Sequence, residues 1–463
     1  MRVRGRDPMM RRATRASLGL MFATACAVDT APARPQWRVS VGTDAQVPRF
    51  GQQLLVEMID LDGNVARGQD RRRLIDASRP ELWPISFGIV PAQGEPPPRL
   101  RIRLVRLDEV GADGLPAGSL HIDSTARLPP ASGGVTDVAA TLAMACFGVP
   151  PDVVAARTCD PGSGRLAQEP TLRAGVGAAS LPAAGSWGPG REVPCSTQPP
   201  PGMVCVPGGA FLLGSAHFFP LPHGYDPAPR HLVHVSPFAI DTEEFTVGQA
   251  QALVGTGKLT APLSTERDST LSPQECTYGR AGDPSRAGSP LNCVTWAQAD
   301  AACRLAGKRL PTEAQWEYAA GNTGDGTTYP WGGDEDVCAN AVVARGRDPV
   351  SEPIECRETA AMPGPGPVAG GSAGDATRSG VRDLGGNLQE WTADAIDDYS
   401  GPCWAGHAEP LNDPTCSASP SPGRAVRGAS WRSLPVSAHS FSRDFAPEDT
   451  ADVSIGFRCA LSM

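Results

Sequence analysis

Cysteine spacing is the feature that most constrains how this chain folds. One of its 13 cysteines, Cys26, lies in a separate N-terminal segment, which leaves 12 for the folded part. Most of these occur as close pairs that flank Gly, Pro or Asp residues: Cys146 and Cys159, Cys195 and Cys205, Cys276 and Cys293, Cys338 and Cys356, and Cys403 and Cys416. Zinc binding is the alternative, but no C-x-x-C occurs and no pair has histidines at ligand spacing beside it. We therefore predict disulfides, each worth about 2–4 kcal/mol, and an oxidising compartment.

Composition favours short strands joined by many turns. The 463 residues include 52 glycines and 47 prolines, a share well above the roughly 12% usual in globular proteins. This argues against long helical bundles. The formal charge of −9 is spread without long runs of one sign, so nucleic acid is excluded as a partner. No apolar run reaches the roughly 18 residues needed to span a bilayer, which excludes a polytopic membrane protein.

The N-terminus has the pattern of an export signal. Several arginines precede a short apolar stretch at residues 16–25, which is followed directly by Cys26. This order resembles a bacterial lipoprotein signal over residues 1–26, with Cys26 acylated and residues 27–36 as a tether. Cleavage by an ordinary signal peptidase and a leader that is never exported are the alternatives. We expect an exported lipoprotein of the outer membrane or cell surface, on the periplasmic or extracellular face, which contacts the membrane only through its lipid anchor.

Residues 37–170 have the pattern of β-structure. Residues 100–107 alternate apolar and basic side chains, which is typical of a strand with one face in water. We predict a small antiparallel β-sandwich here, with the arginines on its solvated face. Residues 171–194 are rich in Gly, Ala and Pro and almost uncharged, as linkers are. A second domain follows at residues 195–463, and the expected fold class is α+β.

Three capping boxes mark helices in the second domain. In a capping box, the side chains of the N-cap Thr and of a Gln three residues later each accept a hydrogen bond from the other's backbone N–H. A glycine then ends each helical segment. The boxes and stops are Thr246, Gln249 and Gly255; Thr295, Gln298 and Gly307; and Thr312, Gln315 and Gly321. The pattern predicts three short helices at these positions.

These helices lie among segments that resemble the successive motifs of the formylglycine-generating enzyme (sulfatase-modifying factor) family. The segments occur in the family's order along the second domain. They are NCVTW at 292–296, ACRLAGKRLPTEAQWEYAA at 302–320, YPWG at 329–332, DLGGNLQEW at 383–391, RGASW at 427–431 and GFRC at 456–459. The resemblance implies a variant of the C-type-lectin-like fold with little regular secondary structure.

The resemblance also locates the family's copper site. The founding reaction of the family oxidises a sulfatase cysteine to formylglycine with copper(I), which two thiolates hold after an R-G-G-S motif; soft thiolates are the ligands that Cu(I) selects. In this chain the two positions fall on Ser433 and Ala438, and no cysteine lies between Cys416 and Cys459. The family pattern pairs Cys459 with Cys303 in a structural disulfide. We therefore expect neither copper nor the formylglycine reaction.

The family's calcium ligands are better preserved. Calcium takes six to eight hard oxygens from carboxylates and carbonyls. The implied ligands are the Asp383 side chain, the carbonyls of Gly386 and Leu388, and the Glu390 carboxylate. The alternative is an ion-free turn in which Glu390 accepts hydrogen bonds from backbone amides. At the family's second calcium site, Asn340 and the Ala341 carbonyl match the first half, whereas the Asp expected downstream is missing near Met362.

Two functions are compatible with these motifs. Near the family's substrate groove the chain has polar side chains at Ser430, Ser433, His439 and Arg443. Ser433 and His439 form a catalytic pair only as a speculation, because no third orienting acid is evident. The first hypothesis is a cell-envelope lipoprotein whose second domain is a calcium-stabilised binding or structural module for an envelope protein or polysaccharide. The alternative is a formylglycine-generating-type oxidase, or another metal-dependent oxidoreductase of the family, that acts through a different site.

Overall fold

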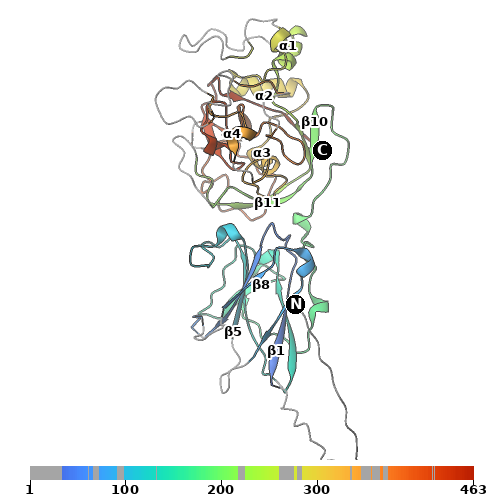
Figure 1. The fold of residues 1–463 in the computed structure, drawn as a ribbon, viewed down its shortest axis with the longest axis vertical. Coiled ribbons are helices and arrows are strands. Elements are labelled where there is room, and N and C mark those ends of the chain that lie inside the picture. Colours follow the sequence, from blue (N-terminus) through green and yellow to red (C-terminus); the bar gives the residue numbers. More distant parts are fainter. Residues whose placement is uncertain are drawn as a thin grey trace, which may run out of the picture.

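The computed structural model shows two parts that lie end to end along the molecule (Figure 1). It describes residues 34–60, 62–65, 72–90, 99–131, 133–216, 225–259, 276–278, 284–333, 336–345, 356, 365–368, 374–419, 421 and 423–463. The predicted signal, Cys26 and most of the predicted tether lie outside these residues. In the described part, no helix is both long and apolar enough to cross a bilayer.

Short strands in two sheets and a hairpin form the N-terminal part. The first sheet has the order β4-β1-β7, the second has the order β3-β2-β5-β6, and β8 pairs with β9. The strands are β1 (Gln36–Thr43), β2 (Gln53–Ile59), β3 (Arg72–Asp76), β4 (Ile85–Ile89), β5 (Arg99–Val105), β6 (Ile122–Arg127), β7 (Val135–Leu142), β8 (Arg157–Asp160) and β9 (Arg165–Gln168). Both sheets contribute to one hydrophobic core, for example through Trp37 of β1 and Ile102 of β5.

One strand pair departs from the antiparallel prediction. β1 pairs with β4 in antiparallel fashion, but it pairs with β7 in parallel over its whole length, from Gln36 opposite Val135 to Thr43 opposite Leu142. The prediction of a wholly antiparallel arrangement is therefore wrong at this edge. Parallel neighbours need a long crossover, and here the entire second sheet lies between β1 and β7 in the chain.

The arginines of β5 do not face water. Arg99 and Arg103 are only 3% and 6% exposed. The side chains pair with acidic residues of neighbouring segments: Arg99 with Glu169 at 2.7 Å, Arg101 with Asp123 at 2.5 Å, and Arg103 with Glu57. The predicted solvated face is wrong because opposite charges on adjacent strands neutralise this face of the sheet.

Residues 171–194 pack against the N-terminal part rather than forming a free linker. The Gly185 N–H donates to the Ala45 carbonyl at 2.8 Å. The Trp187 ring meets the Phe50 ring edge-on, with centroids 5.7 Å apart. The high Gly, Ala and Pro content and the near absence of charge suggested a linker, but backbone hydrogen bonds and an aromatic contact dock the segment.

The C-terminal part combines short strands and short helices, as its composition predicts. Its sheets have the orders β10-β13-β19, β11-β12-β15 and β17-β16-β14-β18. The strands are β10 (Met203–Val206), β11 (Gly209–Leu213), β12 (His231–Val235), β13 (Phe238–Asp241), β14 (Gln389–Ala395), β15 (Leu411–Asn412), β16 (Arg424–Arg427), β17 (Arg443–Ala446), β18 (Ile455–Gly456) and β19 (Ala460–Ser462). The helices are α1 (Val247–Gly255), α2 (Trp296–Leu305), α3 (Glu313–Ala320) and α4 (Val337–Asn340).

The predicted helix caps and disulfides are confirmed. Helices α1, α2 and α3 each begin with a complete capping box, at Thr246, Thr295 and Thr312. The five close cysteine pairs are disulfides, and Cys303 pairs with Cys459 as the family pattern implies. The last of these disulfides joins α2 to the segment before β19 across 156 residues of sequence.

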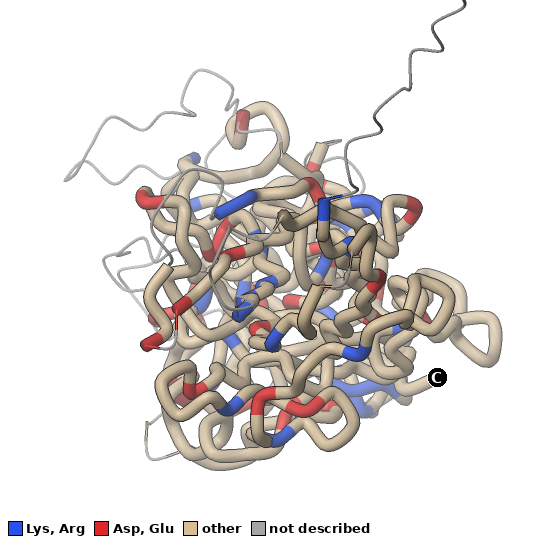
Figure 2. Tube along the Cα trace, turned by 90° about the horizontal axis from the view of Figure 1, so that it is seen from below, with Lys and Arg blue, Asp and Glu red and all other residues tan. Residues whose placement is uncertain are grey.

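The two parts share an interface of apolar and charged contacts. Ala210, Leu212 and Leu232 of the C-terminal part belong to the hydrophobic core of the N-terminal part. Beside them, Arg230 of the C-terminal part bonds Asp108 of the N-terminal part at 2.8 Å. Elsewhere Lys and Arg are interspersed with Asp and Glu. Figure 2 shows no extended region of a single charge sign among the described residues.

Candidate functional site

The segment after β16 holds the position of the family's first thiolate. Gly428 turns the chain with φ +78°, and a β-carbon there would lie 2.7 Å from the Leu384 carbonyl oxygen, so the motif needs glycine. The Ser433 hydroxyl accepts a hydrogen bond from the Ser430 N–H at 2.9 Å and lies 2.9 Å from the Ser430 hydroxyl. This position therefore holds a hydrogen-bonded pair of hydroxyls.

The position of the second thiolate lies in a filled core. Ala438 ends a short 3-10 helix, η8 (Pro435–Ala438), and is fully buried. It belongs to a cluster with Tyr329, Val337 and Val343. Such an apolar environment gives no ligand atom to a metal ion. All 12 cysteines from Cys146 to Cys459 are held in disulfides, so no thiolate is left among the described residues. The residues present do not fit copper(I).

The four polar residues of the predicted groove have different described contacts. Ser430 and Ser433 bond each other, whereas the His439 ring stacks on Phe441 with centroids 4.9 Å apart. Burial lowers the pKa of His439 below its usual range. Arg443 is buried in β17, where its guanidinium bonds the Glu313 carboxylate. The Ser433 hydroxyl has its described contacts with Ser430, and the Ser433–His439 pair stays a hypothesis.

Arg443 belongs to a buried charge network that positions α3 against the sheet. Glu313 accepts bonds from Arg443 Nε at 2.6 Å and from Arg427 Nη1 at 3.0 Å. Arg427 also bonds Glu317 at 2.5 Å. Burial raises the pKa of Glu313, but the charges of Arg443 and Arg427 outweigh it and hold that pKa below its ordinary value. The network has two carboxylates and two guanidinium groups, all of them buried.

Glu390, an implied calcium ligand, is committed to other partners. Its two oxygens accept hydrogen bonds from Arg458 Nε and Nη2 at 2.7–2.8 Å and from Trp316 Nε1 at 2.8 Å. A carboxylate offers about four lone-pair sites, and these contacts use them. Glu390 therefore does not fit the role of a calcium ligand, and its partners are side chains rather than the backbone amides of the ion-free alternative.

Asp383, the other carboxylate of the implied calcium site, is buried and faces a second aspartate. It has a positive φ of 55° and is 1% exposed. Burial raises its pKa to about 7, against the opposing charge of Arg458. Asp375, which the sequence analysis missed, is fully buried, and burial together with the Asp383 charge raises its pKa well above the ordinary value. The Ser-Gly dipeptide at 379–380 was the signal of the hairpin that joins the two aspartates.

A further buried carboxylate, Glu244, caps the loop that follows Asp383. Glu244 accepts hydrogen bonds from Asn387 Nδ2 at 2.6 Å and from the Leu388 N–H at 3.0 Å. Burial, followed by the charges of Asp383 and Glu390, raises the pKa of Glu244 well above its ordinary value. Glu244 thus fixes the loop from which the Gly386 and Leu388 carbonyls were expected to bind calcium.

The structure brings the two implied calcium sites together. The Asn387 N–H donates to the Val342 carbonyl at 2.9 Å. A β-carbon on Gly386 would lie 3.1 Å from the Ala341 β-carbon, and one on Gly374 would lie 2.2 Å from Asn340 Oδ1. Asn340 Nδ2 itself donates to the Asp336 carbonyl at 2.9 Å. The residues of the half-preserved second site therefore lie beside the Asp375 and Gly386 segments.

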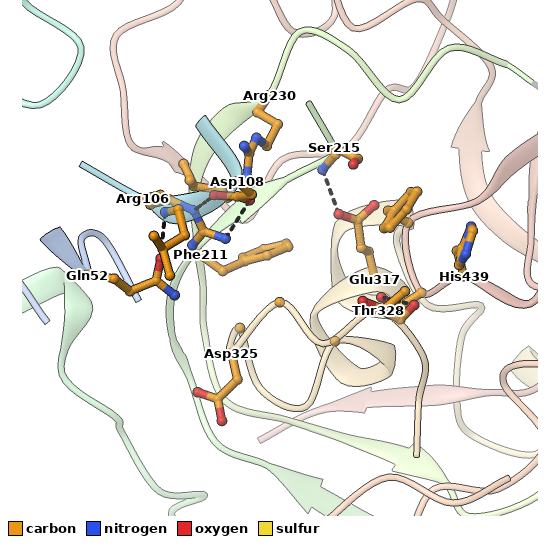
Figure 3. A pocket seen from close by; sticks show the side chains of 18 residues that line it. Gln52, Arg106, Asp108, Phe211, Ser215, Arg230, Glu317, Asp325, Thr328 and His439 are labelled. Carbon is orange, nitrogen blue, oxygen red and sulfur yellow. Dashed lines mark hydrogen bonds and ion pairs between the residues drawn. The ribbon is translucent and has the colours of Figure 1, made fainter. Parts of the chain in front are cut away.

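A cavity of about 450 Å³ lies between the two parts of the molecule. Arg106 and Asp108 of the N-terminal part line one side of it, and Glu317 and His439 of the C-terminal part line another (Figure 3). Burial raises the pKa of Asp108, but the charges of Arg106 and Arg230 lower it to about 2. The sequence gives no signal for this cavity, because its walls come from segments in both parts of the chain.

The described residues contain one group of three close candidate metal ligands outside these sites: Asp397, Cys403 and Cys416. The two cysteines form a disulfide with each other. Their sulfur atoms are therefore not thiolates, and this group does not fit a metal ion.

These features define the class of the protein: a disulfide-rich domain of short strands and capped helices, joined to an N-terminal β part. The chain belongs to the sulfatase-modifying factor family, since residues 191–463 match the sulfatase-modifying factor enzyme 1-like domain.

Similar proteins include enzymes and an inactive relative. The formylglycine-generating enzyme of Mycobacterium tuberculosis is 30% identical over 307 residues, which cover 56% of this chain and 96% of that protein. The inactive C-alpha-formylglycine-generating enzyme 2 of Mus musculus is 28% identical over 298 residues, which cover 57% of this chain and 86% of that protein. Among solved structures, PvdO from Pseudomonas aeruginosa is 23% identical in sequence to this chain. The structural match covers 60% of this chain and all of the PvdO chain, with a TM-score of 0.42.

Proposed function

We propose that this protein is a non-catalytic member of the family: an exported cell-envelope lipoprotein whose C-terminal domain is a calcium-stabilised binding or structural module. The observation that carries the proposal is the state of the two thiolate positions. The hydroxyl of Ser433 is bonded to Ser430, and Ala438 is packed into an apolar cluster. The similarity to the inactive C-alpha-formylglycine-generating enzyme 2 of Mus musculus supports the same interpretation.

The disulfides and the N-terminus support export. Six disulfides require an oxidising compartment during folding. Acylation of Cys26 would anchor the protein at the outer membrane or cell surface, with the sandwich-like N-terminal part between the anchor and the family domain. The partner is then an envelope protein or polysaccharide. An oxidoreductase that acts through another site is the alternative.

A metal titration tests the proposal. The purified mature protein is titrated with Cu(I) against a chromogenic Cu(I) chelator, with a formylglycine-generating enzyme as the positive control. We expect the chelator to keep the copper, because the chain offers no pair of thiolates. The matched variant Ser433→Cys introduces one thiol at the first position, and we expect it to bind copper(I) more tightly than the native chain. Stoichiometric copper or iron in the native protein contradicts the proposal and favours the oxidoreductase.

A further inference from the structure

The cavity between the two parts has a wall that the family domain does not supply. The family match covers residues 191–463, so Arg106 and Asp108 on the N-terminal wall lie outside it. The volume of about 450 Å³ is within the roughly 300–1,000 Å³ of small-molecule sites, which occur preferentially between domains. The lining includes the exposed residues Asp325 and Thr328, so a ligand can enter from solvent. The cavity thus has the size and the position of a ligand site.

The charged side chains that line the cavity have charged partners. Arg106 bonds the two Asp108 oxygens at 2.9 Å, and Arg230 bonds the same carboxylate at 2.8 Å. On the other wall, Glu317 and Asp325 each pair with an arginine of the C-terminal part. A charged ligand would lose its hydration here without gaining an uncompensated opposite charge. The lining therefore favours a ligand without net charge.

Three polar groups of the lining can still bond a ligand. Arg230 Nε is buried and has no hydrogen-bond partner among the described residues. Asp108 accepts three bonds from the two arginines, and because a carboxylate offers about four lone-pair sites, one acceptor position is left. The Gln52 oxygen accepts the Leu107 N–H at 2.8 Å, while its NH₂ group bonds none of the described residues. These side chains lie on the same side of the cavity (Figure 3), and donors next to an acceptor suit hydroxyl groups, which do both.

Aromatic rings supply apolar faces to the same cavity. Phe211 of β11 and Phe441 both belong to the lining. Phe441 is only partly buried, and its ring is held by stacking on the His439 ring, with centroids 4.9 Å apart. Apolar rings with a few polar groups beside them are typical of small-molecule sites. A sugar ring matches this arrangement, because it has C–H groups on its faces and hydroxyls around its edge.

We propose that this cavity binds a neutral saccharide, one or two sugar units of a glycan, between the two parts of the molecule. Its hydroxyls bond Arg230, Asp108 and Gln52, and its C–H face packs on Phe441. Because both parts of the chain supply walls, the bound saccharide also holds them together. The inference selects the saccharide among the partners of the proposed function and rests on the binding role proposed there.

A binding screen with the full mature chain tests the inference. Saturation-transfer NMR compares the neutral disaccharides maltose, cellobiose, lactose, mannobiose and N,N′-diacetylchitobiose with the acidic disaccharide digalacturonate. We expect at least one neutral disaccharide to bind and to raise the melting temperature of the chain. Digalacturonate should bind at least about tenfold more weakly, because its charges would be buried without partners. Binding of digalacturonate alone, or of no neutral disaccharide, overturns the inference and leaves the copper argument of the proposed function untouched.

Two variants locate the bound saccharide. Phe441→Leu removes the ring but keeps an apolar side chain, and it should weaken binding about threefold to tenfold. Gln52→Ala removes one donor and should weaken binding about threefold, with a native melting temperature in the absence of sugar. The matched control is Phe445→Leu, which makes the same change at an exposed ring of β17 and should bind as the native chain does. Native affinity in both Phe441→Leu and Gln52→Ala places the saccharide elsewhere and overturns the inference.

Discussion

Replacing Glu313 by Gln tests the buried network that holds α3 against β16 and β17. The Glu313 carboxylate forms salt bridges with Arg443 Nε at 2.6 Å and with Arg427 Nη1 at 3.0 Å. All three side chains are fully buried. The network contains equal numbers of positive and negative groups, so the substitution leaves one guanidinium charge uncompensated in the core. Breaking a buried ion pair by removing one partner costs about 3–5 kcal/mol, and we expect Glu313→Gln to lose this much stability.

The assay is denaturant unfolding at pH 7, followed by tryptophan fluorescence. The matched control is Glu448→Gln, which removes the Arg424 contact at 2.7 Å in the same part of the chain. The Glu448 side chain is 57% exposed, so its loss should cost at most about 1 kcal/mol. The pKa of Glu313 lies below its ordinary value, so its contribution is complete above that ordinary value and is lost as the pH falls below it. Equal losses for the two variants would refute the reasoning, because burial would then not control the cost.

Two further predictions concern pH dependence and the contact between the two parts. Burial, with a smaller effect of the Glu313 charge, raises the pKa of Asp394 from 3.8 to about 7. The folded state therefore keeps a proton that the unfolded state releases, and stability should fall by up to about 4 kcal/mol as the pH rises from about 4 to 7. Asp394→Asn should flatten this slope in pH-dependent unfolding, and an unchanged slope would assign it to another group. Arg230→Met removes the bonds to Asp108 and Glu109, so we expect a loss of about 2–3 kcal/mol and faster proteolytic separation of the two parts; native resistance to protease would contradict this role.

Local chemistry made part of the fold predictable from the sequence. Each capping box is a contact between residues three apart in sequence. Thr312 and Gln315 therefore predict the start of α3 without any tertiary information. Cysteines close in sequence, such as Cys195 and Cys205, are readily placed within disulfide reach by a short loop. The Cys303–Cys459 pair spans 156 residues, and only the family pattern indicated it.

Long-range pairing was not predictable in the same way. The basic alternation in β5 predicts a strand, but the burial of Arg99 depends on Glu169, which lies in a segment far along the chain. The parallel pairing of β1 with β7 likewise depends on the crossover between them. Hydrophobic periodicity reports which positions are apolar, and it does not report which acids lie opposite the polar ones.

The candidate site shows the same division between local and distant information. The absence of thiols at Ser433 and Ala438 is visible in the sequence, and the structure adds that both positions are occupied by ordinary packing and hydrogen bonding. The commitment of Glu390 to Arg458 involves a partner 68 residues away, so spacing within the loop motif gave no indication of it. Asp375 was missed because its importance arises from the hairpin that places it opposite Asp383.

Turnover of a peptide substrate tests the central claim most directly. The purified protein is supplied with Cu(I), oxygen and a thiol reductant and incubated with a sulfatase-type Cys-x-Pro-x-Arg peptide, beside a formylglycine-generating enzyme under the same conditions. Mass spectrometry then measures conversion of the cysteine thiol to the aldehyde. We predict that the peptide stays unchanged with this protein while the control enzyme converts it. Formation of formylglycine by the native chain would show that a copper site exists without the thiolate pair, and would contradict the account.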